Sequence, residues 1–239
     1  MKYLIILLLI LSISCQKKEI EPPLFCENEL QLFKTFDSLP KTNFSIVDFR
    51  DDYKTKLDSL FRNSELGQAY FLLNFELSEN KKIPLAIRSY NSIYDKTIPP
   101  PFNPKNYCKI YLTEKDSIFI NFEKVEFENI TKNVEDFYFE RGEENYKRIH
   151  IAFYWDKKVN KELLKDLIVQ SLKGYSNYAE KQSIELFKKS ICELSKFELF
   201  ELYERTPFQF RIDFVGDDDE LTHIDFSPYS KYELPTPIE

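Results

Sequence analysis

The chain has 239 residues, of which 43% are hydrophobic and 31% charged, a balance typical of a folded protein. Its net charge of −7 gives no electrostatic gain on a phosphate backbone, so no nucleic-acid partner is expected. Only four glycines accompany 22 phenylalanines and 15 tyrosines, which argues against a glycine-rich phosphate-binding loop.

The chain opens with MKYLIILLLILSISCQKKE, in which one lysine precedes an apolar run that ends at Cys15. The run is shorter than the ~20 apolar residues of a transmembrane helix, so residues 1–14 are predicted to be a secretory signal peptide. A cysteine directly after small residues resembles the bacterial lipoprotein signal, in which that cysteine becomes the first residue and is acylated. The resemblance implies lipidation of Cys15 and anchoring in the cell envelope, with the outer membrane favoured. Because Leu11 stands one place earlier than the leucine usual in that signal, the alternative is an ordinary signal peptide.

Residues 15–26 are predicted to be a lipidated tether, since QKKEIEPP is polar and ends in two prolines. Residues 27–98 form an N-terminal region with apolar residues at helical spacing over 27–37 and 48–61. In residues 68–90, two apolar runs flank SENK, a pattern typical of a hairpin, although the first run also fits a helix.

The prolines of TIPPPFNPKN, residues 97–106, predict a connector between two parts of the chain. Residues 107–215 are then predicted to form an α/β (α+β) domain, and residues 216–239 an acidic, proline-containing tail. The predicted elements of the domain, in chain order, are strands 108–112 and 117–122 joined by a turn, helix 125–139, strand 148–155, helix 161–173, helices 178–192 and 196–204, and strand 208–215.

The alternation of strands and helices predicts a two-layer sandwich, with helices packed on a small mixed sheet. Asn160 is the expected N-cap of helix 161–173, and Gly174 is expected to end that helix. Ile151 and Phe153 are predicted to lie on a central strand, beneath the apolar stripe of helix 161–173. A crossover through helix 125–139 would place strand 117–122 beside strand 148–155.

Two segments, KIYLTEKDSIFINFEKVEFENITKNV and RIHIAFYWDKKV, resemble the start of the periplasmic domain of the ExbD/TolR family. The second ends in that family's Asp-Lys-x-Val turn, here Asp156, Lys157 and Val159, although Lys161 replaces an aromatic residue common there. The resemblance covers roughly residues 99–214. It implies a domain that binds another envelope protein or peptidoglycan and that can form a homodimer. The chain lacks the family's transmembrane helix with its carboxylate, which implies binding without the proton-driven motor.

No catalytic, cofactor-binding or metal site is predicted. His150 and His223 lack the paired spacing of a metal site. The acidic run Asp217-Asp218-Asp219-Glu220 lacks the register of a calcium-binding loop and fits a solvated turn better. Trp155 could be an exposed binding aromatic, but a core aromatic at the end of a strand is the commoner case.

Three cysteines follow Cys15, namely Cys26, Cys108 and Cys192. Their odd number and wide spacing exclude a disulfide scaffold and a CxxC metal site. An oxidising envelope leaves one bridge open, but buried free thiols are the expectation, because cysteine packs well as a small hydrophobe.

The sequence therefore predicts a non-catalytic, lipid-anchored cell-envelope protein. Its α/β domain would bind an envelope protein or the cell wall, for instance by strand addition at residues 208–215 or 108–112. One alternative is a surface-exposed lipoprotein that binds an external ligand, because Gln16-Lys17-Lys18-Glu19 resembles the charged export tags of such proteins. The other is an enzyme of unrecognised type.

Overall fold

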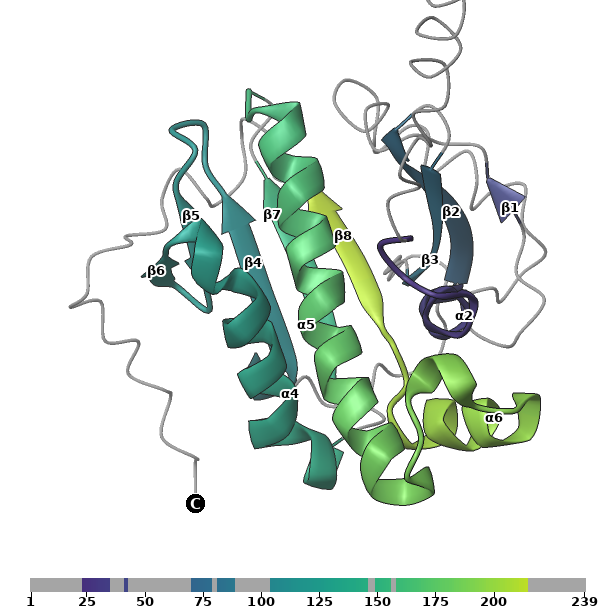
Figure 1. Cartoon of the computed structure of the whole chain (residues 1–239). Coiled ribbons are helices and arrows are strands. Elements are labelled where there is room, and N and C mark those ends of the chain that lie inside the picture. The colour runs from purple at the N-terminus through teal and green to yellow at the C-terminus, as the bar shows by residue number, and fades with distance from the viewer. Residues whose placement is uncertain are drawn as a thin grey trace, which may run out of the picture.

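The computed structural model describes residues 23–34, 41–42, 70–78, 81–88, 104–145, 149–155 and 158–214. In this part of the chain, helices pack on one mixed β-sheet, so the predicted α+β class with its two layers is confirmed (Figure 1). Several predicted segments lie outside the described residues: the signal peptide with Cys15, helix 48–61, most of connector 97–106, and the tail from residue 216.

The sheet has the strand order β1-β2-β3-β8-β7-β4-β5-β6. Its two halves meet at a single residue pair, Ile87 of β3 with Phe210 of β8. The predicted hairpin of residues 68–90 is confirmed as the antiparallel pair β2 and β3, so the helical alternative for its first run is wrong. The strands are β1 (Lys41–Thr42), β2 (Tyr70–Ser78), β3 (Lys81–Arg88), β4 (Tyr107–Leu112), β5 (Ile118–Ile120), β6 (Glu123–Val125), β7 (His150–Trp155) and β8 (Phe210–Phe214).

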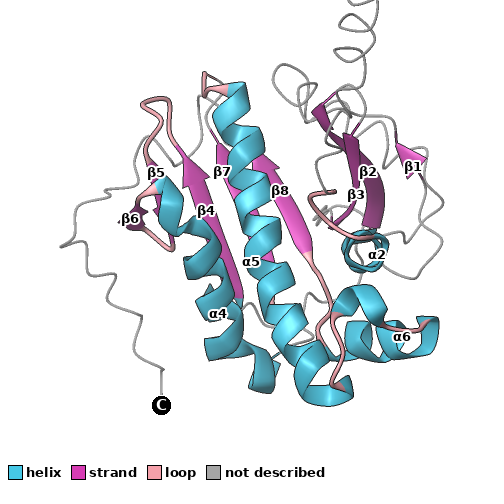
Figure 2. Ribbon diagram, in the orientation of Figure 1, coloured by secondary structure: helices cyan, strands magenta, loops and turns pink. Residues whose placement is uncertain are grey.

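Helices α4 and α5 run side by side across one face of the larger half of the sheet (Figure 2). Helix α2 packs against β3, and α6 lies at the lower end of the view. The α-helices are α2 (Glu27–Lys34), α4 (Ile130–Asn145), α5 (Lys161–Phe187) and α6 (Lys196–Arg205), and short 3-10 turns occur over Pro104–Asn106, Phe127–Asn129 and Ile191–Glu193. None of the described helices is long and apolar enough to cross a membrane.

Strand β7 is a central strand, as predicted, with β4 on one side and β8 on the other. The side chains of Ile151 and Phe153 are fully buried and share one apolar cluster with Leu164, Leu167 and Ile168 of α5. The sequence identifies this strand because its apolar residues occupy one complete face and the residues between them are small or aromatic.

The predicted neighbour of β7 is wrong. β7 pairs in parallel with β4, while β5 lies on the other side of β4. The reason is the short strand β6, which lies where the sequence predicts the start of helix 125–139. β6 is antiparallel to β5 and therefore parallel to β4, and a helical crossover joins parallel strands. The chain thus crosses through α4 and adds β7 beside β4.

Helix α5 does not end at Gly174, as the sequence predicts, but continues to Phe187 and includes residues 178–187 of the predicted helix 178–192. The rest of that predicted helix is wrong, because Lys188 ends α5 and Ile191–Glu193 forms a separate 3-10 turn. Its start is as predicted, since the Asn160 side chain accepts hydrogen bonds from the backbone of Glu162 and Leu163. Gly174 instead allows close approach of α4: a β-carbon there would lie 2.6 Å from the carbonyl oxygen of Thr131. The helix ends at Lys188, which adopts the left-handed conformation typical of a C-cap.

Candidate functional site at the disulfide-linked N-terminal arm

Residues 23–34, here called the N-terminal arm, belong to the same apolar core as the sheet. The Phe33 side chain is fully buried, and its ring centroid lies 5.4 Å from that of Phe208 and 6.1 Å from that of Tyr175. Phe25 meets Phe33 edge to face at 5.0 Å. Aromatic pairs at such distances add to the stability that their buried area provides. The arm is therefore packed on the body and is not a loose extension of the tether.

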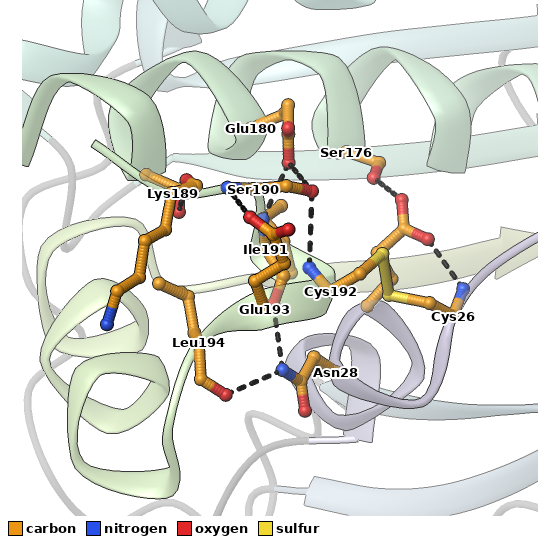
Figure 3. Close-up of a disulfide and its surroundings, with 12 residues drawn as sticks. Cys26, Asn28, Ser176, Glu180, Lys189, Ser190, Ile191, Cys192, Glu193 and Leu194 are labelled. Atoms are coloured by element: carbon orange, nitrogen blue, oxygen red, sulfur yellow. Dashed lines mark hydrogen bonds between the residues drawn. A yellow bond between two sulfur atoms is a disulfide. The ribbon is translucent and has the colours of Figure 1, made fainter. Parts of the chain in front are cut away.

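A disulfide joins the arm to the turn that follows α5 (Figure 3). It links Cys26 to Cys192, which are 166 residues apart in sequence, with their Cα atoms 5.9 Å apart. The expectation of free thiols is wrong for these two cysteines. Spacing alone could not find the pair, because it depends on α2 folding back onto the end of α5.

Hydrogen bonds also hold the arm next to the disulfide, both to α5 and to the turn that carries Cys192. The Glu29 carboxylate accepts one bond from the backbone N–H of Cys26, at 2.6 Å, and another from the hydroxyl of Ser176 on α5. The Asn28 amide nitrogen donates to the carbonyl oxygens of Ile191, at 2.7 Å, and Leu194, at 3.0 Å. The arm therefore satisfies backbone carbonyls of the turn that carries Cys192, which fixes the position of the two segments.

The turn itself is held from α5 and by its own caps. One carboxylate oxygen of Glu180 accepts from the backbone N–H of Ile191, at 2.8 Å, and from the hydroxyl of Ser190. Ser190 and Ser195 each form a capping box, the first with Glu193 and the second at the start of α6. A capping box satisfies two otherwise unpaired backbone donors, so the turn and the first residues of α6 have a defined geometry.

The Glu198 carboxylate completes the second capping box. Hydrogen bonds from Lys189, from the backbone N–H of Ser195 and from its hydroxyl lower the pKa of Glu198 to about 2. The group is thus ionised throughout the pH range in which proteins are usually folded, and its charge lies near the positive end of the α6 dipole.

Cys26, Glu29 and Cys192 bring three potential metal-ligand atoms within 4.8 Å of one another. The two sulfur atoms are bonded to each other, however, and it is the thiolate form of cysteine that binds metals. The arrangement fits a structural cross-link rather than a metal centre.

Cys108 on β4 is a free thiol and is fully buried, as expected from packing. Desolvation by burial raises its pKa to about 12. The thiol is therefore neutral and poorly reactive at neutral pH, since the thiolate is the nucleophilic form.

The other residues considered from the sequence take structural places or lie outside the described residues. Trp155 is 1% exposed and belongs to the core, the commoner of its two interpretations. His150 is 5% exposed and stacks on Tyr107 of β4, with ring centroids 4.8 Å apart. Cys15, His223 and the acidic run from Asp217 to Glu220 lie outside the described residues.

The two strands expected to offer a sheet edge have different outcomes. β4 lies between β5 and β7, so strand addition at residues 108–112 is excluded. β8 lies between β7 and β3, but it pairs with β3 through Phe210 alone. Residues 211–214 therefore have no ladder partner on the β3 side within the described part of the chain.

Comparison with known proteins finds no matching family model, no matching curated protein and no matching solved structure. The resemblance of residues 99–214 to the ExbD/TolR periplasmic domain stays a prediction.

Proposed function

We propose that the chain is a non-catalytic lipoprotein of the bacterial cell envelope, held to a membrane by acylated Cys15, whose α/β body binds another envelope protein or peptidoglycan. The observation that carries the proposal is the Cys26–Cys192 disulfide. Disulfides form and persist in exported proteins and are rare in the reducing cytosol. The bridge thus agrees with the secretory signal expected in residues 1–14.

The other three cysteines have structural roles, which leaves Cys15 as the candidate for acylation. Cys26 and Cys192 are bonded to each other, and Cys108 is buried in the core. Cys15 alone stands at the end of the apolar run, directly after small residues, where the lipoprotein signal has its acylated cysteine. Several acyl chains on one residue are sufficient for stable anchoring.

The N-terminal arm connects the proposed anchor at Cys15 to the folded body over a short distance. Residues 15–26 can span at most about 40 Å even when fully extended. Beyond Cys26 the chain is held by the disulfide and by the hydrogen bonds of Asn28 and Glu29. The anchored end is therefore connected to α5 through Ser176 and to the turn before α6 through Cys192.

One prediction from the sequence and one observation favour binding through the body. The ExbD/TolR resemblance implies contact with envelope proteins or peptidoglycan, and also dimerisation. Residues 211–214 of β8 leave backbone groups that the described strands do not pair, and an extended partner segment can add to such an edge.

The experiment is an affinity capture of the tagged full chain from detergent-solubilised envelopes after crosslinking in cells. The matched control carries residues 1–22 fused to an unrelated domain, so it shares the signal and tether but lacks the body. We expect one envelope protein, or peptidoglycan fragments, to be enriched with the full chain alone. Equal recovery with both chains would contradict a binding function of the body.

The second candidate is a surface-exposed lipoprotein that binds an external ligand, which is favoured by the charged residues Gln16–Glu19 directly after Cys15. Proteinase treatment of intact cells separates the two. Protection of the chain in intact cells, with digestion after permeabilisation, supports the periplasmic proposal, and digestion in intact cells supports the surface alternative.

A further inference from the structure

The disulfide of this chain skips a cysteine. Cys26 pairs with Cys192, while Cys108 lies between them in sequence and stays a free thiol. In the proposed function the sulfur of Cys15 carries a lipid, so these three thiols are the ones that an oxidising envelope can join. Three thiols allow three different single bridges. The two non-native ones, Cys26–Cys108 and Cys108–Cys192, each occupy a cysteine that the native bridge needs.

The unfolded chain favours the two non-native bridges. Cys108 lies about halfway between Cys26 and Cys192, so a bridge to Cys108 closes a loop of about half the 166 residues that the native bridge spans. The probability that the two ends of a flexible loop meet falls with roughly the 3/2 power of its length. Each non-native pair therefore meets about threefold more often than the native pair before the chain folds.

The order of export favours one of these two bridges over the other. A chain exported behind an N-terminal signal enters the oxidising compartment from its N-terminal end. Cys26 and Cys108 therefore reach the oxidant before Cys192 does. Their pairing needs no folded structure, because loop closure in an unfolded segment is sufficient. The expected first product is the Cys26–Cys108 bridge.

The fold requires that this first bridge be broken. The side chain of Cys108 is fully buried on β4, in the same apolar cluster as residues of α4 and α5. Cys26 is held instead at the turn after α5, with its Cα atom 5.9 Å from that of Cys192, and Asn28 bonds to the same turn. A cysteine sulfur forms only one disulfide at a time. A chain with the Cys26–Cys108 bridge therefore lacks the link between the N-terminal arm and the turn.

Folding also hides the thiol that could undo the native bridge. Desolvation by burial raises the pKa of Cys108 to about 12, and the thiolate is the form that attacks a disulfide. Cys108 is thus withdrawn from exchange once β4 is covered by the helices. The rearrangement is therefore directed from the non-native bridge to the native one.

We propose that the Cys26–Cys192 bridge forms by rearrangement of an earlier Cys26–Cys108 bridge, and that a thiol–disulfide isomerase of the envelope is a partner of this chain while it folds. The proposal rests on the proposed function, because it requires export into an oxidising compartment. Uncatalysed rearrangement of disulfides takes minutes to hours, which gives the isomerase its role.

Each step of the rearrangement exchanges one S–S bond for another. A disulfide-bearing oxidant first takes two electrons and two protons from the thiols of Cys26 and Cys108 and becomes a dithiol. The isomerase thiolate then attacks the Cys26 sulfur, and Cys108 leaves as a thiolate that takes up a proton. The Cys192 thiolate attacks the same Cys26 sulfur and releases the isomerase thiolate. The rearrangement itself involves no net oxidation.

The test measures which cysteines are bonded when the isomerase is missing. The full chain is expressed in two bacterial hosts that differ only in the presence of the envelope disulfide isomerase. Free thiols are blocked in the cells with an alkylating reagent, and the chain is purified from membranes. Mass spectrometry of the unreduced peptides then gives the fraction of each bridge. Without the isomerase we expect about a threefold loss of the native bridge, with Cys26–Cys108 as its main replacement.

The matched control is Cys108→Ala, which leaves only the native pair to be joined. Its native bridge should form to the same extent in both hosts. Cys108→Val, which fills the buried site with a larger apolar side chain, repeats the comparison, so that a folding defect of one variant is recognised. An equal native fraction of the unaltered chain in the two hosts overturns the proposal. Loss of the native bridge from both variants without the isomerase also overturns it, because Cys108 would then not be the cause.

The two proposals fail separately in this experiment. A native bridge that forms equally in both hosts removes the isomerase and leaves the anchored lipoprotein unchanged. An unacylated N-terminus removes the anchor at Cys15, while the bridges among the other three cysteines still decide on the isomerase. Three free thiols in both hosts would contradict export and would overturn both proposals.

Discussion

Gly174 shows at the scale of one residue how tertiary packing overrides a local signal. Glycine often ends a helix, and the apolar stripe of residues 161–173 before Gly174 predicts such an end. In the structure α4 crosses α5 at this point, and the hydroxyl of Thr131 donates to the carbonyl oxygen of Gln170 in the preceding turn. The crossing depends on a contact between two helices, so the residues around Gly174 alone could not reveal it.

Gly174→Ala is expected to lower the free energy of unfolding by about 1–3 kcal/mol, the usual cost of overpacking. The sign is informative, because the same change inside an exposed helix stabilises by up to about 1 kcal/mol. The added β-carbon would lie 2.7 Å from that of Val134, so α4 must move. Denaturant unfolding followed by circular dichroism measures the change. Glu185→Ala, at an exposed position of α5, is the control, and a stabilised Gly174→Ala variant would refute the close approach.

Glu198 provides a prediction for pH dependence. Its pKa is about 2 in the folded chain, against an ordinary value of 4.5. Its contribution to stability is therefore present above about pH 4.5 and is lost as the pH falls toward 2. Carbon-detected NMR of the carboxyl group should give a midpoint near 2, and Ser195→Ala should move it upward. A midpoint near 4.5 in the unaltered chain would show that neither the hydrogen bond from Lys189 nor the capping box of α6 forms in solution.

At the scale of elements, residue periodicity predicts most of what is observed in the second half of the chain. The β4–β5 hairpin, β7, the start of α5, and α6 follow from apolar spacing, turn residues and caps. Periodicity fails at β6, whose three residues carry too short a pattern to be recognised. Without β6, the chain would enter α4 from β5, which is antiparallel to β4, and β7 would then lie beside β5. With β6, the chain enters α4 from a strand parallel to β4, and β7 lies beside β4.

The attachment of α2 can be tested by removing its disulfide. In the loop-entropy model, a bridge that closes 166 residues contributes at most about 5 kcal/mol, and measured values for native disulfides are ~2–5 kcal/mol. The double change Cys26→Ser and Cys192→Ser should lower the free energy of unfolding by an amount in that range. Guanidinium unfolding gives the value, and the unaltered chain treated with a reductant is the control, because it loses the bridge without any change of side chain. An unchanged stability would mean that the bridge does not form in solution.

A fragment of residues 106–239 tests whether the predicted domain 107–215 folds without the N-terminal arm. We expect cooperative melting, because the fragment retains five strands, β4 to β8, and helices α4, α5 and α6. We also expect a lower melting temperature than for the whole chain, because Tyr175 and Phe208 lose their contact with Phe33. Differential scanning calorimetry measures both. Absence of a cooperative transition would show that the arm completes the core, as small domains often require.

At the scale of the whole molecule, the prolines of residues 97–106 suggest a boundary and leave open whether residues 27–98 form a domain or pack on the sheet. The described residues of both parts share one apolar core. Phe25 and Phe33 from the start of the chain and Phe75 from the β2–β3 hairpin share a cluster with the strands of the second half. Contacts between distant segments cannot be predicted from the spacing of residues within one segment. The Cys26–Cys192 bridge, which joins residues 166 apart, could not be predicted for the same reason. The export signal predicted for residues 1–14, by contrast, is a local pattern whose prediction needs no knowledge of the fold.

The central claim is that an acylated Cys15 anchors this body in the envelope, and the mass of the mature N-terminal peptide tests it most directly. The full chain, expressed in a bacterial host, is purified from membranes, digested and analysed by mass spectrometry, with Cys15→Ser as the control. We expect a peptide that begins at Cys15 and carries the mass of its acyl chains, and no such species from the variant. A mature chain that begins at an unmodified residue other than Cys15 would contradict the account.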